Sequence, residues 1–204
     1  MSPKVSLVIA TTNAKKIEEF RHLFKSFPVE IVDLKSFPNI KEVEETGSTF
    51  EENAALKALG YAAQTGKLTL GEDSGLCCDA LEGAPGVYSA RFSGAHGSDD
   101  ANNEKVLRLF EKIPDNCRGA HYKSAITLAE PGKIIGTVSG QVHGVIAKEL
   151  SGNQGFGYDP LFFYLPFQKT FGEVPAEMKH KVSHRAKAFE KVCGLLGDYL
   201  KLKF

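Results

Sequence analysis

The sequence predicts a mixed α/β fold, an α+β arrangement in which helices flank a central mixed sheet. Apolar, β-branched runs typical of strands alternate with amphipathic runs typical of helices. Two strand-like runs surround the turn "EPGK", which predicts an antiparallel hairpin. Because the 204 residues contain no repeat or linker, we expect one domain, residues 1–204, folded as two lobes around a cleft.

The N-terminal segment predicts a strand, a tight turn, a helix and a second strand. Residues 4–10 form a continuous apolar run, which suits a strand buried on both faces. Asn13 is a good N-cap for a helix whose apolar residues recur at helical spacing from Ile17 to Phe27. Residues 29–34 then alternate apolar and acidic side chains, as a half-buried strand does.

A second helix is predicted between Thr49 and Gly66. Thr49 and Glu52 have the spacing of a capping box, and glycine is common just after a helix. The apolar "LTL" of residues 68–70 follows as a strand, with an acidic pair expected at its tip.

A third helix is predicted to begin after Ser98 and to end before Pro114, with Val106, Leu109 and Phe110 directed inward.

The C-terminal half predicts mostly strands and one final helix. The hairpin covers residues 121–146, a glycine-rich loop covers residues 151–160, and residues 161–165 form a further strand. The last helix is expected from about Ser183 to Leu202.

Composition excludes several classes of protein. Lys plus Arg equals Asp plus Glu at 25 each, so the chain lacks the broad positive field of nucleic-acid or anionic-membrane binders. The first apolar run is too short for a signal peptide or membrane span, so we expect a cytoplasmic protein with no membrane or nucleic-acid partner. The four cysteines lack CxxC or Cys/His ligand spacing, which favours reduced thiols over a disulfide or a zinc site.

The stretch "ATTNAKK" lies where the first strand leads into the first helix. Lys15 and Lys16 in the first turn oppose the helix dipole, a cost that is explained if an anion such as a phosphate binds there. The alternative is an ordinary capped helix with solvated lysines.

Two acidic pairs lie far apart in the sequence, Glu44 with Glu45 and Glu72 with Asp73. One acid from each pair would suit Mg²⁺, which binds through one or two carboxylates alongside substrate phosphates. Taken singly, each pair is also consistent with a solvated loop or a turn cap.

The loop "GFGYDP" combines two glycines with two aromatic residues. Phe156 and Tyr158 are candidates for stacking on a base, and Asp159 is a candidate acceptor of hydrogen bonds from the base edge. The alternative is a glycine turn whose aromatic rings enter the core.

The stretch "MKHKVSHRAKAF" gathers basic residues at the start of the last helix. Lys179, Lys181, His184 and Arg185 fall within seven residues, and Ser183 is a plausible N-cap, so an anion or a base carbonyl is an expected ligand. The alternative is a solvated basic helix end.

Five stretches, in this order, resemble the inosine triphosphate pyrophosphatase family, the dITP/XTP pyrophosphatases that remove deaminated purine nucleotides. They span residues 10–189 and are "ATTNAKKIEEF", "EETGSTFEENAALKA", "EDSGLCCDALEGAPGVYSARFSG", "GFGYDPLFF" and "MKHKVSHRAKAF". The resemblance implies a homodimeric enzyme that hydrolyses ITP, dITP or XTP in a nucleotide-binding cleft to the monophosphate and pyrophosphate. It also implies Mg²⁺ as cofactor, with Mn²⁺ as an alternative ion.

The resemblance also implies roles for individual residues. Asp73 is the expected proton acceptor and a metal ligand, and Glu44 is the expected second metal ligand, with Glu45 as its close competitor. Arg185 and His184 are expected to read the base, and the glycines after Asp73 are expected to let backbone approach the nucleotide. The expected substrate-binding residues are Thr11, Thr12, Asn13, Ala14, Lys15, Lys16, Ser74, Phe156, Gly157, Tyr158, Asp159, Lys179, His184 and Arg185.

The sequence departs from the family pattern at two places. Thr12 and Lys15 stand where many relatives have the glycines of "TGNxGK", which leaves the shape of that turn open, and Glu72 stands where relatives often have aspartate. Two other functions stay open: a related pyrophosphatase acting on pyrimidine or modified nucleotides, and a non-hydrolytic nucleotide-binding sensor of the same fold.

Overall fold

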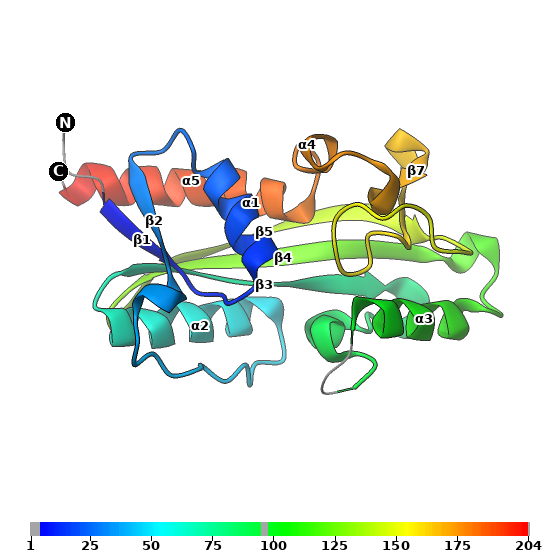
Figure 1. The fold of residues 1–204 in the computed structure, drawn as a ribbon, viewed down its shortest axis with the longest axis horizontal. Coiled ribbons are helices and arrows are strands. Elements are labelled where there is room, and N and C mark those ends of the chain that lie inside the picture. Colours follow the sequence, from blue (N-terminus) through cyan, green and yellow to red (C-terminus); the bar gives the residue numbers. More distant parts are fainter. Residues whose placement is uncertain (1–4, 95–97, 204) are drawn as a thin grey trace. The chain divides into compact units, whose positions relative to one another are not determined.

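The computed structural model describes residues 5–94 and 98–203. Strands and helices follow one another along the chain as the sequence predicts (Figure 1). The elements are β1 (Val5–Ile9), α1 (Ala14–Leu23), β2 (Val29–Asp33), α2 (Phe50–Thr65), β3 (Leu68–Cys78), α3 (Asp99–Phe110), β4 (Gly119–Glu130), β5 (Lys133–Ile146), β6 (Phe162–Tyr164), β7 (Lys169–Thr170), α4 (Ala176–Lys179) and α5 (His184–Lys203).

The strands form one seven-stranded sheet in the order β2-β1-β3-β4-β5-β6-β7. β1 pairs in parallel with β2 and β3, whereas β6 pairs antiparallel with β5 and β7. The sheet is therefore mixed, and the predicted mixed α/β fold is confirmed.

The chain divides into two compact units. Unit 1 comprises the chain up to Asp73, Ala125–Ser139 and the chain from Ala188, and unit 2 comprises Ser74–Ser124 and Gly140–Lys187. The boundaries fall inside β3, β4, β5 and α5. The predicted arrangement as two lobes around a cleft stays a prediction.

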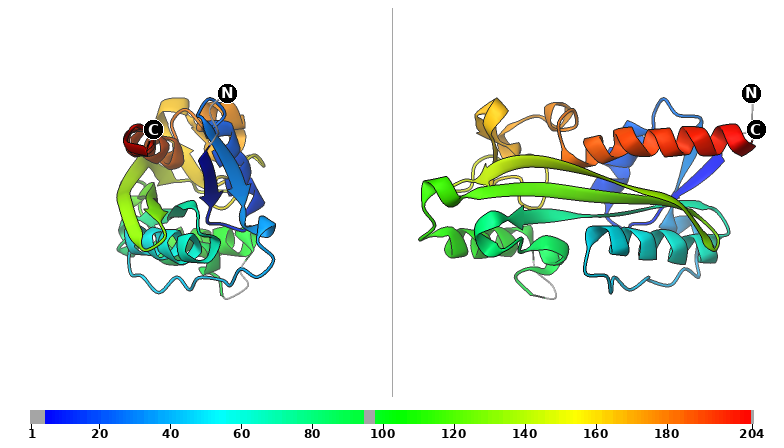
Figure 2. Two further views of the ribbon diagram at one scale, coloured as in Figure 1. Left: turned by 90° about the vertical axis from the view of Figure 1, so that its left-hand side faces the viewer. Right: turned by 180° about the vertical axis from the view of Figure 1, so that it is seen from behind.

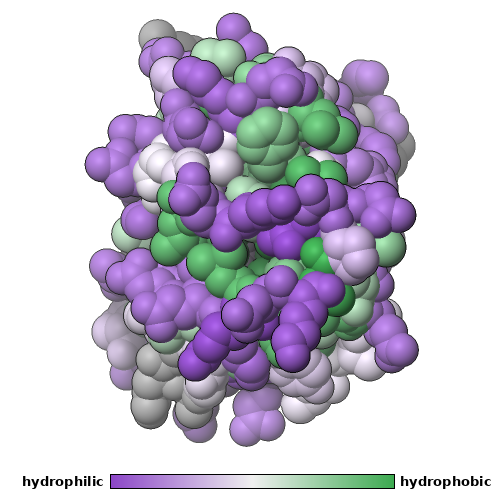
Figure 3. Space-filling model, turned by 90° about the vertical axis from the view of Figure 1, so that its right-hand side faces the viewer, coloured by the Kyte–Doolittle hydropathy of each residue, from purple (hydrophilic) through white to green (hydrophobic). Residues whose placement is uncertain are grey.

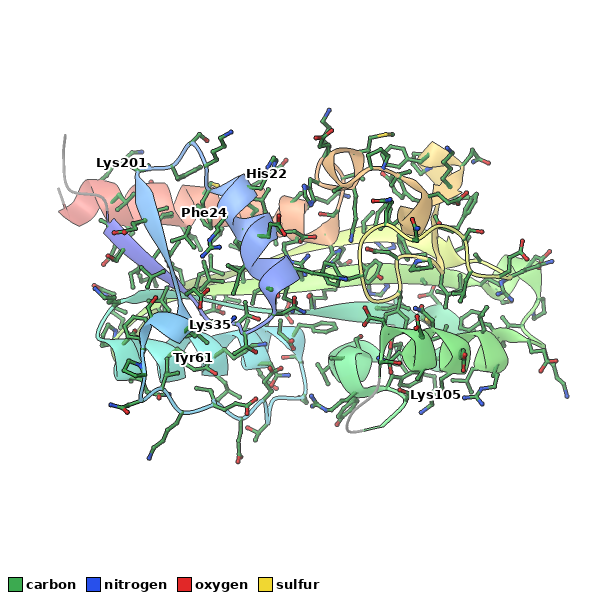
Figure 4. All side chains as sticks on the ribbon, in the orientation of Figure 1. His22, Phe24, Lys35, Tyr61, Lys105 and Lys201 are labelled. Atoms are coloured by element: carbon green, nitrogen blue, oxygen red, sulfur yellow. The ribbon has the colours of Figure 1, made fainter. Side chains whose placement is uncertain are left out.

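In unit 1, β1 contributes to a core on each side of the sheet. Leu7 and Ile9 belong to the cluster that includes Phe24 of α1, whereas Val8 belongs to the cluster that includes Tyr61 of α2. Figures 1 and 2 show α1 and α5 on one face and α2 on the other, and Figure 4 labels Phe24 and Tyr61. Successive side chains of a strand alternate between faces, so the continuous apolar run of β1 is explained.

In unit 2, α3 packs against the sheet through Val106 and Phe110, both fully buried. The prediction that Leu109 points inward is wrong, because 44% of its surface is exposed. The inward positions one turn earlier hold the buried asparagines Asn102 and Asn103, so the buried face of α3 is partly polar. The apolar pattern alone therefore predicts the wrong orientation for Leu109.

A buried arginine closes the C-terminal end of α3. The Arg118 guanidinium donates hydrogen bonds to the carbonyls of Phe110, Ile146 and Ala147 at 2.7–2.9 Å. The Phe110 carbonyl also accepts from the Ile113 N–H, so both bonds replace the intrahelical partner that is missing at a helix end. α3 ends at Phe110, before Pro114, as predicted. On the face drawn in Figure 3, hydrophobic side chains are visible between hydrophilic ones.

Local cap predictions are confirmed. Thr49 and Glu52 form the capping box of α2, and Gly66 ends that helix with φ of 67°. Ser98 accepts from the Ala101 N–H at the start of α3, and Ser183 accepts from the Ala186 N–H at the start of α5. Caps depend on neighbours in sequence, which is why sequence predicts them well.

The strand expected over residues 68–70 is much longer, since β3 continues to Cys78. The prediction that the acids Glu72 and Asp73 stand at a strand tip is therefore wrong; they lie within the strand and are 2% and 7% exposed.

All four cysteines are free thiols, and burial raises the pKa of Cys77 to about 11 and of Cys78 to about 12. No helix in the described part has the length and hydropathy needed to cross a membrane.

Candidate functional site

The two buried acids of β3 are compensated by side chains from two helices. Lys16 of α1 forms an ion pair with Glu72 at 2.8 Å, and Lys57 of α2 forms one with Asp73 at 3.3 Å. The Asn53 amide donates a second hydrogen bond to Asp73 at 3.2 Å. A buried carboxylate is tolerated when it is paired and hydrogen-bonded, so these contacts let charge lie inside the strand.

Helix geometry brings Asn53 and Lys57 to the same carboxylate. The two residues are four positions apart, hence on one face of α2. A Cβ added at Gly71 would lie 2.2 Å from the Ala54 carbonyl oxygen, so only glycine lets β3 approach this helix so closely. Sequence reasoning missed Asn53 and Lys57; their position on the otherwise apolar stripe of α2 was the signal that could have revealed them.

Lys57 lies between two carboxylates, because its ammonium is also 3.1 Å from Glu45. Burial lowers the pKa of Lys57, but the charges of Asp73, Glu45 and Glu72 outweigh that effect and raise it overall. Burial raises the pKa of Asp73, the charges of Glu45 and Glu72 add to this, and the lysines oppose it. We call Lys16, Glu45, Lys57, Glu72 and Asp73 the acid cluster.

The structure distinguishes the two competing loop acids. Glu44, expected as the second metal ligand, is exposed, whereas Glu45 is partly buried and pairs with Lys57. Glu45 and Asp73 therefore converge on a single cation, the Lys57 ammonium, an arrangement that favours Glu45 over Glu44.

The turn before α1 presents exposed polar residues. Asn13 caps the helix by accepting from the N–H groups of Lys15 and Lys16, so two helix-start amides are already occupied. Thr11 accepts from the Asn13 N–H at 3.2 Å. Lys16 faces Glu72, which gives its place in the first turn a partner within the protein.

In unit 2, Asp159 organises the glycine-rich loop. Its carboxylate is 1% exposed and accepts hydrogen bonds from the Phe156 N–H at 2.9 Å and from the Lys179 ammonium. A Cβ at Gly155 would lie 2.0 Å from this carboxylate. Because its oxygens are engaged inside the protein, the arrangement favours a structural role for Asp159 over reading a base edge.

Of the two aromatic rings in this loop, one is accessible. Tyr158 is 3% exposed and donates to the Ser89 carbonyl at 2.8 Å, so its ring belongs to the core. Phe156 is partly exposed, and Lys179 and Arg185 lie over its ring at 4.9 and 5.7 Å from the centroid. Phe156 is thus the more accessible of the two rings, and the two cations already face it.

The basic start of α5 is largely buried, so a solvated basic helix end is wrong for these residues. His184 is 4% exposed and stacks on Tyr122, with ring centroids 4.7 Å apart. Arg185 is 2% exposed and donates to the Ser74 hydroxyl at 3.1 Å. Lys181 alone of the four basic residues is exposed.

The predicted residues therefore form two groups. We call Phe156, Asp159, Lys179, His184 and Arg185 the aromatic–basic cluster of unit 2, whereas the acid cluster belongs to unit 1. Gly75, expected to let backbone approach a nucleotide, instead admits Ser89 of the same unit, whose hydroxyl would lie 2.1 Å from an added Cβ. Among the described residues, no three metal-ligating side chains are grouped to hold an ion.

Comparison with known proteins identifies the family. A family model described as the Ham1 family matches residues 7–195. The chain belongs to the Ham1 family. Its curated relatives include the dITP/XTP pyrophosphatase of Desulforamulus reducens, 47% identical over 94% of this chain and 96% of the relative, and that of Listeria monocytogenes, 46% identical over 91% and 92%.

Solved Ham1-family structures have the same fold. A HAM1 protein from Coxiella burnetii superposes with a TM-score of 0.87 at 36% identity, covering 95% of this chain and 99% of that one. A protein from Mycobacterium abscessus named nucleoside-triphosphatase / dITP/XTP pyrophosphatase gives 0.76 at 41% identity, covering 92% and 97%. The family resemblance drawn from the five stretches is thus confirmed.

Proposed function

We propose that this Ham1-family chain is a nucleoside triphosphate pyrophosphatase that hydrolyses the nonstandard purine nucleotides ITP, dITP and XTP to the monophosphate and pyrophosphate. The names of its relatives support this activity over substantially the whole chain length. The observation that carries the chemistry is the acid cluster, in which Glu45 and Asp73 face one cation beside the start of α1.

The acid cluster fits a divalent cation. Carboxylate oxygens are the ligands that Mg²⁺ prefers, and Glu45 and Asp73 already converge on a positive charge. Mg²⁺ binds through one or two carboxylates together with substrate phosphates, so a set of three protein ligands is not required. When bound there, Mg²⁺ or Mn²⁺ would supply charge neutralisation on the phosphates.

The lysines and the α1 turn are assigned to the phosphates. Lys16 and Lys57 carry positive charge beside the acids, and Thr11, Thr12 and Lys15 line an accessible turn at a helix start. Preplaced positive charge stabilises the charge that develops on the departing pyrophosphate.

Asp73 is assigned the role of general base. A water oxygen attacks the α-phosphorus, its proton passes to the Asp73 carboxylate, and the bond from the α-phosphorus to the bridging oxygen breaks to release pyrophosphate. Burial raises the pKa of Asp73, which favours proton uptake by its carboxylate, and the Asn53 amide donates a hydrogen bond that orients it.

The aromatic–basic cluster is assigned to the base. Phe156 offers a ring for stacking, and His184 and Arg185 offer donors for the six-position oxygen that distinguishes hypoxanthine and xanthine from adenine. A buried polar group left unpaired by the wrong base discriminates strongly.

A substrate panel tests the proposal. Purified protein is incubated with ITP, dITP, XTP, GTP, ATP and a pyrimidine triphosphate, with Mg²⁺ and with a chelator, and the products are separated. We expect monophosphate and pyrophosphate from the first three, only with the metal present. Diphosphate and phosphate as products would contradict the assigned bond cleavage, and binding without pyrophosphate release would indicate the nucleotide sensor. Homodimerisation and cytoplasmic localisation stay predictions.

A further inference from the structure

One helix of unit 2, α3, holds two backbone segments with polar side chains. On one side, Asn102 donates to the Ala90 carbonyl at 3.3 Å and accepts from the Ser93 N–H at 2.7 Å. Lys105, labelled in Figure 4, donates to the Phe92 carbonyl at 2.6 Å. These contacts fix residues 90–93, at the end of the 3₁₀ helix Gly86–Arg91 and just after it.

On another side, α3 holds a single residue of the glycine-rich loop by both of its backbone groups. The Gly157 N–H donates to the Asp99 carboxylate at 2.7 Å, and the Asn103 amide donates to the Gly157 carbonyl at 2.9 Å. Asp99 and Asn103 are four positions apart, so both project from one face of the helix. We call this pair the Gly157 clamp.

Phe156 lies between two glycines of positive φ. Gly155 and Gly157 have φ of 75° and 64°, a region that glycine enters and leaves at little cost. Phe156 lies between them and points its ring at Lys179 and Arg185. Since glycine restricts the backbone little, hydrogen bonds to the loop backbone, from Asp159 to Phe156 and from α3 to Gly157, hold the direction of the Phe156 ring.

We propose that Asp99 and Asn103 are positioning residues for nucleotide recognition, which hold Gly157 and thereby hold the Phe156 ring where the base stacks. The role rests on the proposed function of the loop and assigns neither residue a contact with the nucleotide. A loop that spends less time in its binding conformation lowers apparent affinity in proportion and leaves the chemical step intact. Loss of the clamp therefore raises KM and spares kcat.

Four variants test the clamp. Asp99→Ala removes the acceptor and Asn103→Leu removes the donor at similar volume, and each is expected to raise KM for ITP about tenfold with kcat within about twofold. Asp99→Asn keeps an oxygen acceptor and should restore most of the affinity. Ser98→Ala removes the N-cap of the same helix without touching the loop, so it should lower the melting temperature and leave KM unchanged.

A second measurement does not depend on activity. Exchange of the Gly157 amide hydrogen, followed by NMR, should be faster in Asp99→Ala than in the wild type and in Ser98→Ala. A folded Asp99→Ala protein with accelerated Gly157 exchange and unchanged KM would overturn the proposal, as would unchanged exchange. If the wild type hydrolysed no ITP, the proposed function would fail, while the exchange data and ITP affinity measured by calorimetry would still decide whether the clamp exists and supports binding.

Discussion

The acid cluster of unit 1 and the aromatic–basic cluster of unit 2 are built in different ways. In the acid cluster, helices and a strand place four of the five charges: Lys16 lies on α1, Lys57 on α2, and Glu72 and Asp73 on β3, while Glu45 lies on a loop. In the aromatic–basic cluster, α4 and α5 carry the three basic residues, but the ring proposed to stack, Phe156, lies on a loop between two glycines of positive φ.

The difference suits the two parts of the proposed reaction. Transferring a proton and neutralising phosphates need charges fixed to within a fraction of an ångström, which rigid elements provide. Reading a base needs a surface that discriminates between similar rings, and loops on a scaffold commonly carry such specificity. Changes in the acid cluster should therefore mainly affect rate, and changes in the aromatic–basic cluster should mainly affect substrate preference.

The largest expected effect is on Asp73. Asp73→Asn keeps the volume and one oxygen but removes the proton acceptor, so kcat for ITP should fall by at least about a hundredfold. Steady-state kinetics would measure this, and a thermal melt would confirm that the variant is folded. A folded variant with a near-normal rate would remove Asp73 from the role of base.

The second-largest expected effect is on base selectivity and concerns Arg185 of the aromatic–basic cluster. Arg185→Ala removes a buried donor to the six-position oxygen, so the ratio of kcat/KM for ITP to that for ATP, which lacks this oxygen, should fall by at least about tenfold. Lys181→Ala, a neighbouring exposed basic residue, serves as the matched control and should leave the ratio unchanged. An unchanged ratio in Arg185→Ala would separate the aromatic–basic cluster from base recognition.

The same contrast between elements and loops explains what sequence could predict. Caps such as Thr49 with Glu52, and the hairpin around "EPGK", depend on residues close in sequence and were predicted correctly. The full length of β3 was not predicted, because a strand containing Glu72 and Asp73 is stable only when lysines from distant helices pair with them. Local pattern cannot show such remote compensation.

The candidate site shows a similar limit. Motif resemblance selected Phe156 and Asp159 together, but only the structure shows that Asp159 is engaged inside the protein while Phe156 stays accessible. Sequence also left Glu44 and Glu45 as competitors, since neighbouring loop residues point in directions that only backbone geometry determines. The side chain facing Lys57 belongs to Glu45.

A matched pair of variants would sharpen this last point. Glu45→Gln removes one of the carboxylates that converge on Lys57, so kcat/KM should fall about tenfold and half-maximal activity should require more Mg²⁺. Glu44→Gln changes an exposed neighbour, so its kcat/KM should stay within about twofold of the wild-type value. The opposite order of effects would restore Glu44 as the second ligand.

The smallest expected effect is on thermal stability and concerns one capping box in each unit. Each contains a Thr-x-x-Glu capping box, Thr49 with Glu52 in unit 1 and Thr170 with Glu173 in unit 2. Hydrogen bonds from the Ser48 side chain and backbone lower the pKa of Glu52, and those from Thr170 lower the pKa of Glu173. A lowered folded-state pKa means stability that is present above the unfolded value, about 4.3, and lost as pH falls through the folded value.

Replacing either glutamate with glutamine keeps a capping side chain but removes the titrating charge. The melting temperature of the wild type should therefore exceed that of each variant at pH 7, and the two should converge as pH falls below the unfolded pKa of about 4.3 and through the lower folded value. Circular dichroism melts across this range would measure the difference, which should be small because both glutamates are solvent-exposed. A difference in melting temperature that stays constant down to pH 3 would show that the carboxylate charge does not contribute to the stability of the capping box. Convergence for the Glu52 variant alone would show that only the charge of Glu52 contributes measurably to stability.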